Sequence, residues 1–289
     1  MEKVNIQGVP ETMLQTLFAR AAHSQKREHK FYDIKAIEIV KQLDYDFSGA
    51  EKDTAMSSGV IARTILLDRM VGTFLEENPD ATVVNIACGL DTRVYRLDNG
   101  QVRWYNLDLP EVIEIRRRFL DEQGRISMIA KSAMDESWAA EIEYPTGKVL
   151  VVIEGLVMYL TETDVRKILS IICSRFEHAE IIMETMNPFV MRHMKEKSIE
   201  ASKARFTWGM KSGKELESMV PELTWIKDVS LVEGMKELYP IYHVLGRIRP
   251  VRNISNKLVI LRKQAGGNAI CNLDPGRYVN CARIELSKM

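Results

Sequence analysis

The stretch that decides the fold is Thr82-Val83-Val84-Asn85-Ile86-Ala87-Cys88-Gly89-Leu90-Asp91-Thr92-Arg93. Its first six residues form a short and nearly continuous apolar run, which is typical of a parallel strand buried on both faces. The strand is followed almost at once by Gly89, which has no side chain and allows a ligand to come close to the backbone. In open α/β sheets, ligands bind beyond the carboxyl ends of the strands. The stretch therefore predicts a buried strand that leads into a ligand-binding turn.

Similar apolar runs recur along the chain, and segments with helical spacing separate most of them. The runs lie at Val102–Leu107, Ile126–Ala130, Val149–Ile153 and Ile181–Met183, with further strands expected near Trp225–Leu231 and Lys257–Leu261. The helical segments among them include Glu111–Leu120 and Asp164–Phe176. This alternation predicts an α/β fold with a mostly parallel sheet of seven strands and helices on both faces. The last two strands are expected to close one edge of the sheet.

Helical patterns dominate the first eighty residues. A first helix follows Pro10, a second spans Phe31–Leu43 and a third runs from about Thr54 to Glu77, with a polar turn at 44–49. Residues 187–220 interrupt the strand pattern, and no periodicity remains after Lys263. We expect one domain over residues 1–263, with a helical cap at about 10–77 and an inserted helical lid at about 187–220. An irregular tail is expected at 264–289.

The composition is that of an ordinary globular protein without surplus charge. Of the 289 residues, 46% are hydrophobic, and 40 basic residues balance 40 acidic ones. A nucleic-acid-binding protein held by bulk charge would carry a basic surplus, so this class is excluded. The N-terminus lacks the apolar core of a signal peptide, and no apolar stretch approaches the roughly 18 residues that span a membrane. A cytoplasmic protein without membrane contact is expected.

Neither a metal site nor a catalytic base can be read from the sequence. The four cysteines show no CxxC spacing, and the chain contains no HExxH motif, so we expect no metal ion. The five histidines form no nucleophile–His–acid pattern, so no general base is assigned.

An acidic residue ends the second predicted strand. Asp108 follows Ala87 by about 20 residues, the distance at which an acid binds the ribose hydroxyls in nucleoside-binding α/β folds. The alternative is that Asp108 caps the helix that begins at Pro110. Only Gly89 is present in the first turn, so the GxGxxG pattern of dinucleotide-binding proteins is not met. The turn at Gly89 and the acid at position 108 together favour a ribose-binding role for Asp108.

Two further charged residues stand where a buried charge needs a partner. Glu154 ends the apolar run Val149–Ile153, and either a ligand ammonium or a structural arginine could neutralise it. Arg63 shares the apolar face of its predicted helix with Met70, whereas Asp68 points away. A ligand carboxylate and a structural ion pair are equally compatible with Arg63. A site that binds a ribose, an anion and a cation suits an amino-acid nucleoside such as S-adenosylmethionine.

Three segments together resemble the leucine carboxyl methyltransferase family, and more narrowly its bacterial branch of tetracenomycin-type polyketide O-methyltransferases. They are residues 83–93 with their Gly-Leu-Asp-Thr-Arg element, residues 104–112 ending in Asp-Leu-Pro-Glu-Val, and residues 154–160. The resemblance covers about residues 10–263, including Ala62-Arg63-Thr64 and Ala204–Gly209. It implies a class I, Rossmann-like methyltransferase that moves a methyl group from S-adenosylmethionine to oxygen. The implied acceptor is a hydroxyl or carboxylate of a small molecule, or a protein carboxyl group; the oligomeric state is not indicated.

The resemblance also implies roles for individual residues. Arg63 is expected to hold the cofactor carboxylate with two parallel bonds from its planar guanidinium, and Glu154 to lie below the methionine moiety. The family more often has glycine where Ala87 stands, and an Asp-Leu-Arg-like element where residues 131–135 read Lys-Ser-Ala-Met-Asp. The implied cofactor-binding residues are Arg63, Ala87, Cys88, Gly89, Asp91, Asp108, Leu109, Ser132, Ala133 and Glu154. The implied acceptor-site residues are Tyr159 and Trp208.

Two other functions remain open at this point. A nicotinamide-dependent oxidoreductase would share the sheet and the ribose-binding acid, but it would need further glycines near Gly89. A non-catalytic protein could keep the crevice for S-adenosylmethionine without an acceptor site.

Overall fold

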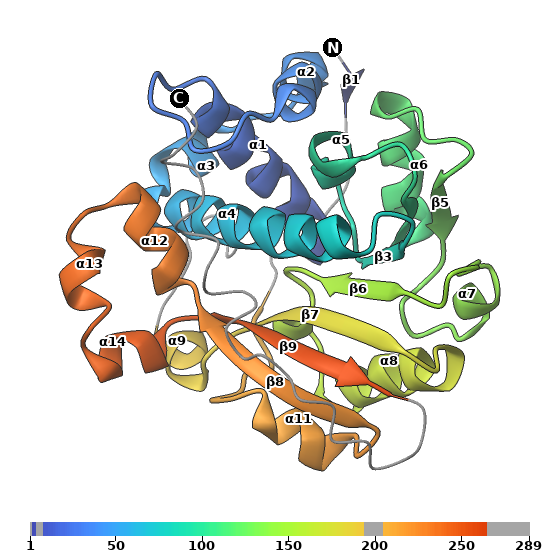
Figure 1. Ribbon diagram of the computed structural model, residues 1–289. Coiled ribbons are helices and arrows are strands. Elements are labelled where there is room, and N and C mark those ends of the chain that lie inside the picture. The colour runs from blue at the N-terminus through green and yellow to red at the C-terminus, as the bar shows by residue number, and fades with distance from the viewer. Residues whose placement is uncertain (1, 4–7, 194–204, 265–289) are drawn as a thin grey trace.

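The computed structural model describes residues 2–3, 8–193 and 205–264 of the chain. A seven-stranded sheet forms its centre, in the order β5–β4–β3–β6–β7–β9–β8 (Figure 1). The strands are β3 (Thr82–Ile86), β4 (Arg103–Asp108), β5 (Ile126–Ala130), β6 (Val149–Ile153), β7 (Ala179–Thr185), β8 (Leu223–Ser230) and β9 (Lys257–Lys263). Neighbouring strands from β5 to β7 are parallel, whereas β9 is antiparallel to both β7 and β8. The predicted α/β sheet is confirmed, and β9 inserts between β7 and β8.

Helices cover both faces of the sheet (Figure 1). One face carries α4 (Thr54–Glu77), α5 (Arg93–Leu97) and α12 (Val232–Leu238). The other carries α7 (Ser137–Ala140), α8 (Glu162–Arg175) and α11 (Lys214–Met219). The side chains of β3 alternate between these layers: Val83 packs towards α4, whereas Val84 and Ile86 pack towards α8. This period of two is what buries an apolar strand on both faces.

The N-terminal cap packs at the carboxyl end of the sheet. It contains the short helix η1 (Val9–Glu11) and the helices α1 (Thr12–Ser24), α2 (Ile34–Gln42) and α3 (Ser48–Lys52), together with a two-strand pair, β1 (Glu2–Lys3) and β2 (Leu43–Asp44). Apolar residues of α1 and α2 form one core cluster with Leu90 and with α6 (Pro110–Phe119). The cap is therefore anchored directly beside the turn that follows β3.

One prediction in the cap is confirmed only in part. Residues 44–49 were expected to be a polar turn; residues 45–47 form the turn, while Asp44 ends β2 and Ser48 begins α3. The reason is packing: the ring of Phe47 stacks on Phe18 at a centroid distance of 4.9 Å, and Ala50 is buried between α1 and α4. The aromatic contact turns this segment inward, which a reading of local polarity does not reveal.

The segment predicted as a lid, residues 187–220, does not form one unit. Its described parts include α9 (Pro188–His193) and α11, and no described residue between 187 and 220 lines the cavity described below. Helix α11 buries Leu216 and Met219 in the main core, so it belongs to the layer on the sheet. Residues 194–204 and the predicted tail beyond residue 264 lie outside the described residues. Between β8 and β9, α12 is followed by two short helices, α13 (Tyr242–Leu245) and α14 (Arg249–Ile254).

Candidate functional site

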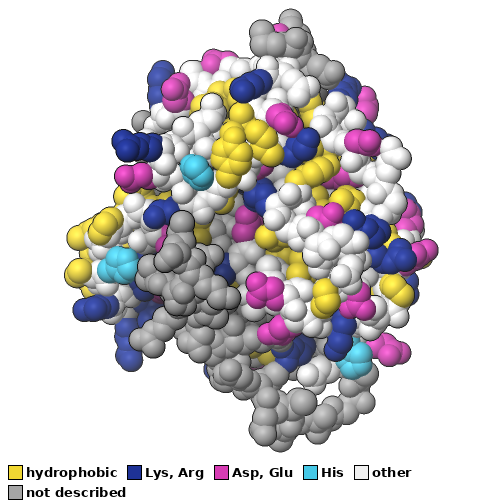
Figure 2. All heavy atoms as spheres, turned by 45° about the horizontal axis from the view of Figure 1, so that its top comes forward, with side chains coloured by type: hydrophobic (Ala, Val, Ile, Leu, Met, Phe, Trp, Pro, Cys, Tyr) yellow, Lys and Arg dark blue, Asp and Glu magenta, His cyan; other side chains and the backbone are white. Residues whose placement is uncertain are grey.

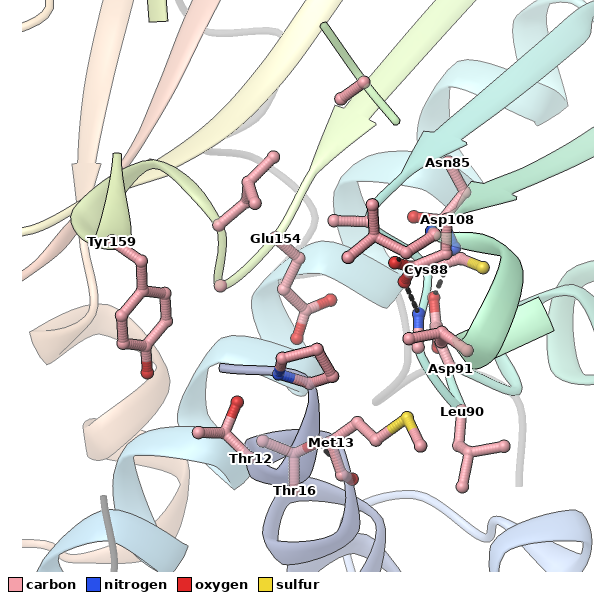
Figure 3. Close-up of a pocket in the computed structure, with 18 of the residues that line it drawn as sticks. Thr12, Met13, Thr16, Asn85, Cys88, Leu90, Asp91, Asp108, Glu154 and Tyr159 are labelled. Atoms are coloured by element: carbon pink, nitrogen blue, oxygen red, sulfur yellow. Dashed lines mark hydrogen bonds between the residues drawn. The ribbon is translucent and has the colours of Figure 1, made fainter. Parts of the chain in front are cut away.

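One cavity of about 270 Å³ lies at the carboxyl ends of β3, β4 and β6, against helix α1 (Figure 3). All ten residues expected to bind the cofactor line it, from Arg63 on α4 to Glu154 after β6. Tyr159, on the short helix η2 (Val157–Tyr159), also lines it. The sequence pattern did not single out the contribution of the cap, which is Pro10, Thr12, Met13, Thr16 and Arg20.

The turn after β3 has a strained backbone. Ala87 has a φ of 56° and Gly89 a φ of 48°. Among the described residues, Ala87 is the one non-glycine residue with a positive φ. An L-residue in this left-handed region costs about 1 kcal/mol or more relative to glycine. This strain is the physical reason why glycine suits position 87.

Asp108 lies beside this turn, at the end of β4. Its Oδ2 accepts the backbone N–H of Gly89 at 2.7 Å, and its Oδ1 accepts that of Leu109 at 2.7 Å. Burial raises the pKa of Asp108 to about 6, although the two N–H groups and the charge of Arg116 act in the opposite direction. The N-cap residue of α6 is Leu109, without a side-chain cap bond. The carboxylate is therefore not the helix cap and is directed at the turn.

Glu154 is held between two arginines. Nε of Arg63 lies 2.6 Å from Oε1 of Glu154, and Nη2 of Arg93 donates to Oε2 at 2.8 Å. Burial alone would raise the pKa of Glu154, but the charges of Arg63 and Arg93 outweigh it and lower that pKa. Nη1 of Arg63 donates at 2.7 Å to Glu184, whose pKa is raised by burial. Of the two kinds of partner considered for Glu154, a ligand ammonium and a structural arginine, the structure shows two arginines, Arg63 and Arg93.

This arrangement corrects the expected two-bond grip of Arg63 on a ligand carboxylate. Such a grip needs two neighbouring nitrogens of the guanidinium. Two of its three nitrogens, Nε and Nη1, already meet Glu154 and Glu184. No described residue pairs with the third, Nη2, and the side chain lines the cavity. The geometry leaves Arg63 one nitrogen for a ligand.

Arg93 is the centre of the charged network around the site. It is 1% exposed, and its three nitrogens meet Asp68 at 2.7 Å, Asp91 at 2.7 Å and Glu154 at 2.8 Å. Asp68 also receives a bond of 2.8 Å from Arg96, one helical turn further along α5. The side of α4 on which Asp68 lies is therefore packed against α5. In the sequence, the three-residue spacing of Arg93 and Arg96 indicates two cations on one helical face. It does not indicate which residues they pair with.

The residues expected to bind adenine and the acceptor lie in different surroundings. Ser132 and Ala133 follow β5 and line the cavity, and the carbonyl of Ala133 already accepts the indole N–H of Trp138 at 3.0 Å. The ring of Tyr159 packs on Phe206 at 5.3 Å, which brings a residue of the predicted lid next to the cavity wall. Trp208 is not among the residues that line the cavity, and its partly buried side chain packs against the main core.

The described residues were also considered as a metal site and as a membrane span. No group of three or more His, Cys, Asp or Glu side chains within them could hold a metal ion. No helix in this part of the chain is long and apolar enough to cross a membrane.

Comparison with known proteins gives a consistent result. The sequence profile of leucine carboxyl methyltransferases matches residues 13–173. The tetracenomycin polyketide synthesis O-methyltransferase TcmP of Streptomyces glaucescens is 34% identical over 236 residues, which cover 81% of this chain and 87% of that protein. The S-adenosyl-L-methionine-dependent methyltransferase dpfgK of Gibberella zeae is 32% identical over 245 residues, covering 77% and 82%. The crystal structure of a candidate methyltransferase from Thermobifida fusca YX shares the fold, with a TM-score of 0.56 at 14% identity, over 87% of this chain and 94% of that one.

Proposed function

The chain belongs to the leucine carboxyl methyltransferase family, and from this premise we propose that it methylates an oxygen atom of a small organic molecule. It is an S-adenosylmethionine-dependent methyltransferase, as its family and both relatives are. The relative TcmP is named as an O-methyltransferase of polyketide synthesis, which supports oxygen as the acceptor atom and a metabolite as its carrier. The family and the relatives do not favour a nicotinamide-dependent oxidoreductase.

The observation that carries the proposal is the clustering of complementary groups in one cavity. Asp108 presents a carboxylate at the end of β4, next to the side-chain-free position of Gly89. A carboxylate there can accept hydrogen bonds from both hydroxyls of a ribose. Arg63, which also lines the cavity, offers Nη2 to an anion, while Leu109 and Met134 supply apolar surface for a planar base. The residues therefore fit an amino-acid nucleoside.

The charge balance of the network also suits the amino group of the cofactor. Four arginines, at positions 20, 63, 93 and 96, face five acids, at positions 33, 68, 91, 154 and 184. One acid is thus in excess, and burial raises the pKa of Glu184. An ammonium group near Glu154 would offset the excess negative charge, because opposite charges attract strongly where water is excluded. We place the amino acid moiety of the cofactor against the Arg63–Glu154 ion pair, with its carboxylate at Nη2 of Arg63 and its ammonium next to Glu154.

When bound, S-adenosylmethionine supplies an electrophilic methyl group on a sulfonium. The protein's part is to hold donor and acceptor in line, which can account for much of the rate acceleration. Thr12, on α1, and Tyr159, on η2, face the cavity and form the proposed acceptor wall (Figure 3). The cap and the sheet form walls of the same cavity, so we propose that residues 1–263 act as one domain.

The test combines binding with product analysis. Calorimetry should show that the purified protein binds S-adenosylmethionine and S-adenosylhomocysteine, and that Asp108→Asn binds both more weakly. Tritium from the labelled methyl group should then enter aromatic hydroxyl or carboxylic acid metabolites. Mild alkali releases methanol from a methyl ester and leaves a methyl ether intact, so it separates the two acceptor classes. Label found only on nitrogen or sulfur would contradict oxygen transfer.

A further inference from the structure

Two arginines hold consecutive backbone carbonyls of the turn after β3. Nη2 of Arg20, on α1, donates to the carbonyl of Leu90 at 2.7 Å. Nη1 of Arg116, on α6, donates to the carbonyl of Gly89 at 2.9 Å. Arg20 is 4% exposed and Arg116 is 0% exposed. Two buried cations from two different helices thus end on neighbouring peptide groups of the cofactor turn.

Each of these arginines pairs with a different acid, and Asp33, the partner of Arg20, also pairs with Arg96. Nε of Arg20 lies 3.0 Å from Oδ2 of Asp33, which is 1% exposed. Nε of Arg116 donates to Glu122 at 3.1 Å. Because the acids balance the positive charges of the arginines, we expect the arginines to act on the turn through directed hydrogen bonds to its carbonyls. A guanidinium suits this task, since its nitrogens are fixed in one plane and can meet an acid and a carbonyl together.

The turn needs such support because its conformation is strained. Ala87 and Gly89 both have positive φ values. A strained backbone persists only where its surroundings over-determine it. With the carbonyls of Gly89 and Leu90 fixed by the arginines, the N–H of Gly89 meets Oδ2 of Asp108 at 2.7 Å. The same contacts that fix the carbonyls therefore orient the carboxylate proposed to bind the ribose.

We propose that Arg20 and Arg116 are positioning residues that hold the cofactor turn in its ligand-binding shape, with Asp33 and Glu122 as their supports. We call these four residues the turn clamp. The proposal rests on the assignment of the cavity to S-adenosylmethionine. It also gives the cap a role in cofactor binding, because half of the clamp is built on α1 and α2: Arg20 lies on α1, and Asp33 is the N-cap residue of α2.

Packing between the cap and the turn supports this role independently. A Cβ atom at Gly89 would lie 3.0 Å from Cβ of Met13, which is also on α1. Helix α1 therefore touches the turn at Gly89 and bonds to it at Leu90. A displacement of α1 would disturb both contacts at once.

The test uses Arg20→Lys and Arg116→Lys. Lysine keeps the charge, but its single nitrogen cannot meet both the acid and the carbonyl in the manner of a guanidinium. Calorimetry with S-adenosylhomocysteine should show the Kd of each variant raised about 10- to 100-fold, the effect expected when a binding group is slightly misplaced. Near-ultraviolet circular dichroism and urea unfolding establish that each variant is folded.

Two matched controls separate the clamp from general loss of stability. Arg125→Lys disturbs a guanidinium that likewise meets an acid, Asp98, and a backbone carbonyl, that of Val102, at the end of β4 opposite to the site. Arg175→Lys removes bonds to backbone carbonyls far from the site, those of Ala139 and Ile142. Both controls should lose stability and keep the Kd within about threefold of the wild type.

A pH profile supplies a readout that a merely structural role would not change. Asp108 faces the N–H groups of Gly89 and Leu109, the charges of Arg116 and Glu111, and the thiol of Cys88. If the clamp variants misplace the N–H of Gly89, Asp108 loses a bond to its charged form. The pH at which S-adenosylhomocysteine affinity is half lost should then rise by about 0.5–1 unit. It should stay at the wild-type value in Arg125→Lys.

The outcomes are distinct. Folded clamp variants with the wild-type Kd and pH midpoint would overturn the clamp, as would an Arg125→Lys variant that is weakened equally. If a lysine variant does not fold, Arg116→Gln combined with Glu122→Gln removes cation and acid together, and it should fold and bind weakly. A wild-type protein that binds neither S-adenosylmethionine nor S-adenosylhomocysteine would instead overturn the proposed cofactor site itself.

Discussion

The backbone N–H of Gly89 meets the carboxylate of Asp108 at 2.7 Å, although the two residues belong to different strand-end turns. This bond ties the turn after β3 to the end of β4. It also means that the group proposed to bind the ribose is oriented by the turn proposed to approach the cofactor. Neighbouring parallel strands bring their carboxyl ends to one edge, which is why residues so far apart in sequence can act together.

Cofactor affinity should depend on the ionisation of Asp108. Burial raises its pKa to about 6, and the ionised form is the one that accepts hydrogen bonds from ribose hydroxyls. Affinity for S-adenosylmethionine should therefore strengthen as the pH rises through about 6 and level off above pH 7. Asp108→Asn should bind more weakly by about 1.5–3 kcal/mol and lack this pH dependence. Calorimetry between pH 5 and 8 measures both effects, and the same slope in both proteins would assign the titration to another group.

Replacing the strained alanine should stabilise the protein. Ala87→Gly removes the cost of a positive φ, about 1–2 kcal/mol, but adds about 0.4–1 kcal/mol of entropy to the unfolded chain. The net gain in the free energy of unfolding should be about 0.5–1 kcal/mol by urea denaturation. Ala55→Gly, an exposed position in helix α4, should lower stability instead. A loss in Ala87→Gly would show that the side chain contributes packing that outweighs the strain.

Removing Arg63 should destabilise the protein in a pH-dependent way. Arg63→Met leaves Glu154 and Glu184 buried with less compensation, and breaking such pairs costs about 3–5 kcal/mol. In the variant the folded pKa values of the two glutamates rise above their unfolded values, so the penalty grows as the pH rises from about 4.5. Urea unfolding should therefore show a larger loss at pH 8 than at pH 5. The control on the same helix is Arg69→Met, whose half-exposed pair with Glu237 should contribute less than about 1 kcal/mol.

Arg63 should also decide whether the protein distinguishes S-adenosylmethionine from its decarboxylated form. The wild type should bind the decarboxylated ligand more weakly, because Nη2 of Arg63 is proposed to meet the missing carboxylate. In Arg63→Lys the single ammonium is shared with Glu154 and Glu184, so the preference should shrink. Competition binding of the two ligands measures it. An unchanged preference would show that the carboxylate is held elsewhere and that Arg63 serves the ion pairs alone.

Tyr159 and Trp208 should behave differently, although both were expected at the acceptor site. Tyr159→Phe should change the KM for the acceptor by several-fold, since the side chain lines the cavity, and leave the unfolding free energy nearly unchanged. Trp208→Phe should lower stability by about 1–2 kcal/mol through lost packing and leave that KM unchanged. Steady-state kinetics and urea unfolding on both variants provide the comparison. A raised KM in Trp208→Phe alone would reverse the two assignments.

The sheet and the edge that carries the site were predictable from the sequence. Apolar runs of strand length, separated by helices, leave few alternatives to an open parallel sheet, and helix α4 has the predicted bounds of Thr54 and Glu77. The positions of Asp108 and Glu154 at the cavity were predictable for the same reason. An acid at the carboxyl end of a buried strand lies where ligands bind.

The partners of these residues could not be predicted from spacing. Arg20 reaches the carbonyl of Leu90, and Arg93 reaches Asp68, only because the cap and α5 pack against α4 and the turn. Such contacts depend on how helices are placed in three dimensions, which a local pattern does not encode. Trp208, which was carried over by resemblance alone, packs partly buried against the main core and does not line the cavity, so its role at the acceptor site stays a prediction.

The late insertion of β9 sets an order on folding at the ribosome. Strand β8 pairs only with β9 within the sheet, yet it leaves the ribosome some thirty residues earlier. During that interval β8 has no neighbour, and the outer edge of β7 is open to any extended chain nearby. The methyltransferase core can close on its ligand-binding side while this other edge is still unpaired. We therefore expect β9, which pairs with both β7 and β8, to close this open edge of the nascent chain.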